Sequence, residues 1–179
     1  AGYSNLTRVL TVGNRRAPKG ECWLDFVDYL AHAQGLQAIL VAAFELGSEP
    51  HALGYYLQQI KMAAGEAWLA APFQFNGEDR RRIRRLKQLA SQSGAKLLAT
   101  TEPLMHAGDR RALLDIVTCI REKKRLEEAG AMLAKNAERQ LKPAQEIRRI
   151  FRDAPEAVAE SLRFLDGVSF SMDDLRYEY

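Results

Sequence analysis

The sequence has few of the residues that build metal centres and disulfide frameworks. Its 179 residues include two cysteines, Cys22 and Cys119, and three histidines. The cysteines lie far apart, and neither belongs to a CxxC motif or a histidine-rich spacing, so a zinc cluster or a disulfide framework has no support. This cysteine usage favours a reducing, cytoplasmic setting.

Long apolar runs and a strong excess of one charge are missing as well. No apolar run approaches the roughly 18 residues that span a bilayer, and the first residues lack a basic segment leading into an apolar run. We therefore expect no membrane partner. The net charge is only +3, which falls short of the basicity typical of dedicated nucleic-acid-binding proteins. The overall charge decides nothing about partners.

The length and the ends of the chain suggest part of a larger protein. With 47% hydrophobic residues, the chain can bury one sizeable core. It begins Ala1-Gly2 without a methionine and stops soon after an apolar-patterned segment. We therefore expect a fragment of a longer polypeptide.

What is present is an alternation of strand and helix patterns. Three short apolar runs predict buried strands, at residues 36–41, 67–73 and 96–100. Helical spacing of apolar residues predicts helices between them, at 50–64 and 76–93. In the second of these helices, Asn76 would cap the first turn and Gly94 would follow the last. Strands and helices that alternate through short connections predict an α/β fold with parallel strands and outer helices.

Helical periodicity also predicts helices toward both ends of the chain. Toward the start, helices are expected at 2–12 and 23–33, separated by a basic loop at 14–20. Toward the end, the expected helices are 110–123, 143–152 and 155–165, of which the last two begin with proline. The polar, alanine-rich stretch 127–140 is weakly patterned and predicts an irregular connection.

Several short segments recur in an order that is typical of one protein family. They are Asn5-Leu6-Thr7-Arg8, Arg15-Arg16-Ala17-Pro18-Lys19-Gly20-Glu21, Arg110-Arg111-Ala112-Leu113-Leu114-Asp115, Thr118-Cys119-Ile120-Arg121, Asn136-Ala137-Glu138-Arg139-Gln140-Leu141 and Asp174-Leu175-Arg176-Tyr177-Glu178-Tyr179. In this order they resemble the error-prone branch of the bacterial C-family DNA polymerases, relatives of the polymerase III α subunit. The last run is the most specific, because a similar run ends the first domain of that family.

The resemblance implies a partial, distorted β/α barrel of the polymerase and histidinol phosphatase (PHP) type, TIM-like in plan. Residues 1–125 would form the partial barrel, and residues 126–179 a helical exit segment toward the polymerase body. The family's first His-x-His metal motif would precede this sequence, and the carboxylates that hold two metal ions during nucleotide transfer would follow it. The fragment would therefore contain no catalytic residue and no cofactor. The intact parent would be a DNA-directed DNA polymerase that uses Mg²⁺, binds DNA and serves translesion synthesis and repair.

The resemblance also implies a degenerate metal site at the strand ends. In metal-bearing relatives, the segment corresponding to 99–106 carries an aspartate and a histidine. Here Glu102 stands in place of the aspartate, and Leu104 in place of the histidine, which removes a nitrogen ligand. His106 aligns with a family histidine, but one imidazole and one displaced carboxylate fall short of the three protein ligands typical of catalytic zinc. Gln74, where relatives place an acidic residue, is a second sign of loss.

Six basic side chains crowd the helix predicted at 76–93: Arg80, Arg81, Arg82, Arg84, Arg85 and Lys87. The simpler interpretation is a solvated outer face, on which Glu78 and Asp79 pair with arginines at i+3 or i+4. The functional interpretation is contact with nucleic-acid phosphates, without sequence preference, through Arg80, Arg81, Arg84, Arg85 and Lys87. Aromatic residues are not interleaved there, which disfavours stacking on bases.

Three hypotheses about function remain open at this point. The leading one is a structural part of an error-prone polymerase whose metal-free cleft does no chemistry. The first alternative is a metal-dependent phosphoesterase or proofreading nuclease, in which a missing half supplies the other ligands. The second is a nucleic-acid-binding interaction module. A parallel sheet edge left unpaired would also favour a homodimer of the isolated fragment.

Overall fold

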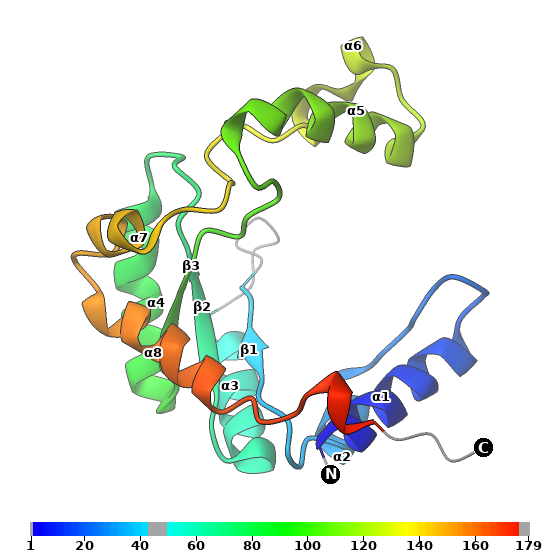
Figure 1. Ribbon diagram of the computed structural model, residues 1–179. Coiled ribbons are helices and arrows are strands. Elements are labelled where there is room, and N and C mark those ends of the chain that lie inside the picture. The colour runs from blue at the N-terminus through cyan, green and yellow to red at the C-terminus, as the bar shows by residue number, and fades with distance from the viewer. Residues whose placement is uncertain (1, 43–49, 176–179) are drawn as a thin grey trace.

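The computed structural model describes residues 2–42 and 50–175 (Figure 1). Residues 43–49 and the two ends of the chain lie outside the described residues. Of the closing motif of the family resemblance, Asp174 and Leu175 are described and residues 176–179 are not.

The centre of the molecule is a parallel sheet of three strands in the order β1-β2-β3. The strands are β1 (Ile39–Leu40), β2 (Trp68–Pro72) and β3 (Lys96–Thr100). Helices α3 (Pro50–Ala64) and α4 (Asp79–Ser93) form the connections between them, as parallel neighbours require. The prediction of a parallel α/β arrangement with outer helices is confirmed, although β1 is shorter than expected. The sheet of the described residues is open and has three strands, so the partial barrel stays a prediction, as does the division at residue 125.

The core forms where apolar helix faces pack on the sheet. Every residue of β2 is buried, as the uninterrupted apolar run predicts for a strand covered on both faces. The buried cluster combines Leu69 and Leu97 from the strands with apolar residues of α3 and α4. Helix α7 (Ala144–Ile150) leads to Phe151, which is 1% exposed, and helix α8 (Pro155–Asp166) contributes the buried Ala157.

Helix α8 lies along β3 and closes one side of the sheet (Figure 1). Its Phe164 packs edge-on against Trp68, and its Glu160 accepts a hydrogen bond of 3.2 Å from the Trp68 indole. Helices α7 and α8 each begin within one residue of the proline that the sequence marks as their start, Pro143 and Pro155. Proline is favoured there because it has no amide donor to lose in a first helical turn.

Helix α4 begins later than the sequence suggests. Glu78, and not Asn76, precedes its first turn. The Asn76 side chain instead accepts a hydrogen bond from the amide of Glu78, in a turn before the helix. At the other end, Gly94 adopts the left-handed conformation (φ 63°) expected just past a helix.

The N-terminal part departs from prediction at two places. Helix α1 runs from Gly2 to Arg16, through half of the predicted basic loop, since Arg16 forms ion pairs with Asp25 and Asp28 and basic side chains stabilise a helix C-terminus. Helix α2 (Phe26–Ala31) is shorter than expected, because the Asp28 carboxylate accepts from the Asp25 amide and fixes the start there.

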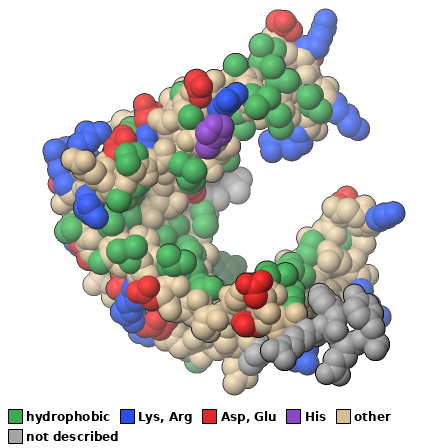
Figure 2. Space-filling view, viewed as in Figure 1, with side chains coloured by type: hydrophobic (Ala, Val, Ile, Leu, Met, Phe, Trp, Pro, Cys, Tyr) green, Lys and Arg blue, Asp and Glu red, His purple; other side chains and the backbone are tan. Residues whose placement is uncertain are grey.

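A helical arm projects from the carboxyl end of the sheet. It comprises η2 (Gly108–Arg110), α5 (Arg111–Glu122), α6 (Leu126–Ala129) and η3 (Gly130–Met132). The stretch predicted to be an irregular connection thus contains two short helices. The arm and the α1–α2 pair extend from opposite ends of the sheet and leave an open C-shaped molecule (Figures 1 and 2).

The final short helix η4 (Met172–Asp174) lies beside α1, where Phe170 stacks on Tyr3. Within the described residues, no helix is both long and apolar enough to cross a bilayer.

Candidate functional site

Parallel strands end at the same edge of a sheet, and this brings Gln74 and Glu102 together. Glu102 Oε2 accepts a hydrogen bond of 2.7 Å from Gln74 Nε2. The same oxygen lies 3.4 Å from Nη2 of Arg139. Arg82, from α4, donates to Gln74 Oε1 at 2.9 Å. An amide, a carboxylate and two guanidinium groups therefore form one connected network at the strand ends.

The carboxylate of Asp79 anchors this network to the backbone that follows β2. The residue is 3% exposed, and its carboxylate accepts from the amides of Gln74 (2.7 Å) and Asn76 (3.0 Å). It also pairs with Arg82 at 3.5 Å, the i+3 pairing that the sequence predicts. Because its charge is matched by a guanidinium and by backbone donors, the buried carboxylate is compensated.

The chain returns to the strand ends through residues 136–142. Asn136 Nδ2 donates to the carbonyls of Gln74 and Phe75, and Arg139 Nε donates to the carbonyl of Glu102 at 3.0 Å. Two backbone hydrogen bonds join the same two segments: the Leu104 amide donates to the Arg139 carbonyl, and the Leu141 amide donates to the Met105 carbonyl. We call Gln74, Asp79, Arg82, Glu102, Asn136 and Arg139 the strand-end cluster.

The candidate metal ligands do not converge. Leu104 is half exposed and has no ligand atom, and His106 lies exposed beyond it. Within the part of the chain that the structure describes, no group of three His, Cys, Asp or Glu side chains is placed to hold a metal ion. Of the residues that the sequence singled out for a metal site, the structure brings together Gln74 and Glu102 and leaves Leu104 and His106 apart from them.

The basic helix has a mixed environment. Arg80 pairs with Asp153 at 3.7 Å and Lys87 with Glu156 at 2.5 Å, so these two side chains connect α4 to the α7–α8 junction. Arg81, Arg84 and Arg85 are exposed. None of these three forms an ion pair with another described residue.

The two carboxylates that bind basic partners beside α8 have lowered pKa values. The hydrogen bond from Lys87 lowers the pKa of Glu156 below its ordinary value of 4.5. The hydrogen bond from Lys96 likewise lowers the pKa of Glu66, which also contacts Arg163 of α8. Both groups lie away from the strand-end cluster and stabilise the packing of α8.

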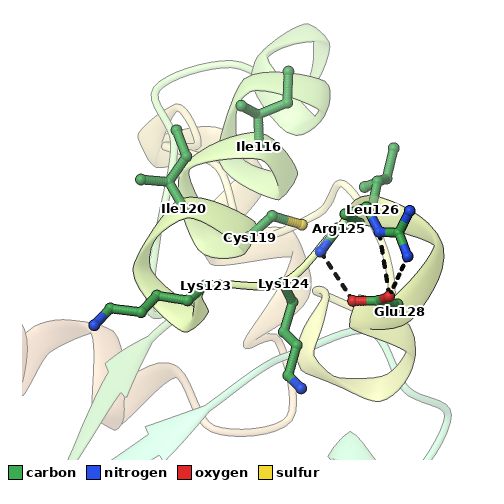
Figure 3. A pocket seen from close by; sticks show the side chains of 8 residues that line it. All are labelled: Ile116, Cys119, Ile120, Lys123, Lys124, Arg125, Leu126 and Glu128. Carbon is green, nitrogen blue, oxygen red and sulfur yellow. Dashed lines mark hydrogen bonds and ion pairs between the residues drawn. The ribbon is translucent and has the colours of Figure 1, made fainter.

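A separate groove of about 590 Å³ lies on the arm (Figure 3). Ile116 and Ile120 of α5 line the groove together with the buried Cys119. Arg125 is hydrogen-bonded to Glu128 on one wall. Figure 3 shows the polar groups of Arg125 and Glu128 paired with each other, while the side chains of Lys123 and Lys124 extend away from that pair.

Sequence reasoning missed Arg139 and Asn136 as members of the strand-end cluster. Both lie in the stretch predicted to be an irregular connection, which has no periodicity to reveal what it contacts. The signal was the motif Asn136-Ala137-Glu138-Arg139-Gln140-Leu141, which carried family resemblance without a structural assignment.

Comparison with known proteins finds relatives of the chain among the error-prone DNA polymerases. It is 41% identical over 180 residues to the error-prone DNA polymerase of Rhodopseudomonas palustris (strain BisB5) and 44% identical over 185 residues to that of Bradyrhizobium diazoefficiens. A third relative, the error-prone DNA polymerase of Caulobacter vibrioides, is 36% identical over 182 residues. The whole chain, or 99% of it, is matched in each case, but it spans only 16% of each relative's length. No protein-family model matches the sequence. Over its whole length the chain is therefore similar to one part of the error-prone DNA polymerases, and it corresponds to a fragment of a larger polymerase of that kind.

Proposed function

We propose that this chain is a structural portion of a PHP-type β/α domain in an error-prone DNA polymerase, and that its strand ends do no chemistry. The parallel α/β arrangement with outer helices fits the later part of such a domain. The proposed role is to support the polymerase body. Nucleotide transfer, with its Mg²⁺ and its DNA substrate, takes place in other parts of the polymerase, which works in translesion synthesis and repair in the cytoplasm.

The engagement of Glu102 is the observation that carries the proposal. This carboxylate is the strongest candidate ligand in the sequence, yet its Oε2 already contacts Gln74 and Arg139. A guanidinium this close repels a divalent cation.

The neighbouring residues do not fit a metal ion either. A catalytic zinc or manganese site needs about three protein ligands and an open position. At these strand ends, Leu104 offers no donor atom and Gln74 is committed on both sides, to Glu102 and to Arg82. We therefore assign no metal-dependent step to this chain.

Activity measurements on the whole polymerase that carries this stretch would test the proposal. A Glu102→Gln variant is expected to extend a primer at the wild-type rate, and neither protein should hydrolyse a phosphodiester or remove a mismatched 3′ nucleotide at the strand-end cluster. A hydrolytic activity that is present in the wild type and absent in Glu102→Gln would favour the phosphoesterase or nuclease alternative.

A contact with the DNA backbone is a second candidate, favoured by one observation. Arg81, Arg84 and Arg85 are exposed on α4 without an ion pair among the described residues, whereas Arg80 and Lys87 are occupied by Asp153 and Glu156. Binding of the chain to duplex DNA would weaken steeply with salt if these arginines neutralise phosphates. Undetectable binding at low salt would eliminate the interaction-module hypothesis.

A homodimer of the isolated chain also remains a proposal. Strand β1 ends the described sheet, and Ile39 and Val41 are exposed there. Sedimentation velocity would report self-association through this edge as a concentration-dependent dimer, and a monomer at all concentrations would exclude it.

A further inference from the structure

Two residues at the strand ends adopt a backbone conformation that side chains disfavour. Phe75 follows β2 with a φ of 58°, and Glu102 follows β3 with a φ of 45°. Left-handed backbone costs a non-glycine residue about 1 kcal/mol or more and persists only where surrounding contacts impose it. Contacts at this edge of the sheet must therefore hold both residues in the left-handed conformation.

Residues 136–142 supply those contacts to both strained positions. The Phe75 carbonyl accepts from Asn136 and the Glu102 carbonyl accepts from Arg139. Lys142, whose side chain is 1% exposed, lies with its Nζ 4.8 Å from the centre of the Phe75 ring. One short segment thus contacts the end of each strand, through backbone and side chain together.

Arg139 makes two of these contacts with one side chain. Its Nε donates to the Glu102 carbonyl and its Nη2 approaches the Glu102 carboxylate. The two side chains are only 30% and 22% exposed. Arg139 accordingly both compensates the charge at the end of β3 and attaches its own segment there.

We propose that Arg139 supplies the cation that compensates Glu102 at the strand ends, and that its bond to Glu102 holds residues 136–142 against β2 and β3. The proposal extends the function given above, since it names what occupies the edge where a metal ion would otherwise act. The contact also has a structural role, because residues 136–142 connect the strand ends to α7 and α8, which come next in the chain.

A double-mutant cycle on the 179-residue chain tests this coupling. Arg139→Met leaves the Glu102 carboxylate without its cation and is expected to lower Tm by about 4–8 °C. Adding Glu102→Gln removes the uncompensated charge, so the double variant should regain at least about half of that loss. Arg125→Met is the matched control, because Arg125 pairs with Glu128 on the exposed arm and its loss should shift Tm by about 1 °C or less.

Hydrogen exchange adds a local readout. In Arg139→Met, the amides of Leu104 and Leu141, which bond across the junction, should exchange about 10-fold faster, while those of β2 and β3 stay protected. Additive Tm losses, or unchanged exchange at Leu104 and Leu141, would overturn the proposal. If Arg139→Met does not fold, recovery of folding by the added Glu102→Gln supports the coupling, and failure to recover contradicts it. None of these outcomes depends on whether the whole polymerase hydrolyses phosphodiesters, so the two proposals can fail separately.

Discussion

The sheet layer and the helical arm show opposite uses of apolar residues. In the sheet layer, Leu69 and its neighbours in β2 are fully enclosed by helices of the same chain. On the arm, Leu113, Ile116 and Ile120 follow an amphipathic spacing on α5, yet each is more than half exposed. Helical periodicity therefore marks an apolar face, and it does not tell whether this chain covers that face.

The difference explains why the molecule is open in shape. Elements with partners in the chain, such as α3, α4 and α8, close around β2 and β3 (Figure 1). The segments that flank the arm meet at the strand-end cluster, where Arg139 and Glu102 are joined by a hydrogen bond and an ion pair. Stability is consequently expected to be concentrated in the sheet layer.

The largest expected effect comes from shortening matched leucines in the two regions. Leu69→Ala should lower the free energy of unfolding by about 3–4 kcal/mol, because it leaves a cavity in an enclosed site. Leu113→Ala, on the exposed face of α5, should change it by about 0.5 kcal/mol or less. Urea denaturation followed by circular dichroism measures both, and equal losses would break the comparison.

The next effect concerns the buried carboxylate of the strand-end cluster. Asp79→Asn places an amide where two backbone amides donate, so one donor loses its partner and unfolding should become easier by about 2 kcal/mol. Asp153→Asn is the control, since that carboxylate is 61% exposed and its loss should cost about 0.5 kcal/mol or less. A cost for Asp79→Asn as small as that of the control would refute the anchoring role.

The smallest effect is the pH dependence of the α4–α8 ion pair. Because Lys87 depresses the pKa of folded Glu156, the pair stabilises the chain above pH 4.5, and this contribution disappears as the pH falls through the depressed value. Both side chains are about half exposed, so the contribution is about 0.5 kcal/mol. The difference in stability between wild type and Glu156→Gln should be present at pH 7 and should shrink as the pH is lowered below 4.5. A difference that does not shrink at the lower pH would contradict it.

Much of the fold could be predicted from local patterns. The apolar runs located the three strands of the described sheet, and Gly94 and the prolines at 143 and 155 marked helix boundaries. The errors lie where tertiary contacts decide: Arg16 extends α1 through pairs with Asp25 and Asp28, and Asp79 shifts the turn before α4 by binding amides of residues 74 and 76.

Only part of the strand-end cluster could be predicted from the sequence. Gln74 and Glu102 follow successive parallel strands, so their proximity follows from the strand pattern alone. Arg139 arrives from a segment 37 residues after Glu102, and no local property of residues 127–140 indicates that it returns to the strands. His106 was singled out by resemblance, but a short turn after β3 leaves it exposed.

Metal analysis of the chain tests the central claim most directly. After equilibration with Zn²⁺ or Mn²⁺ and removal of free metal, elemental analysis should find far less than one metal ion per chain, with no difference between the wild type and Glu102→Ala. One metal ion per wild-type chain that is lost in Glu102→Ala would contradict the account, because the carboxylate would then bind a metal ion in preference to Arg139.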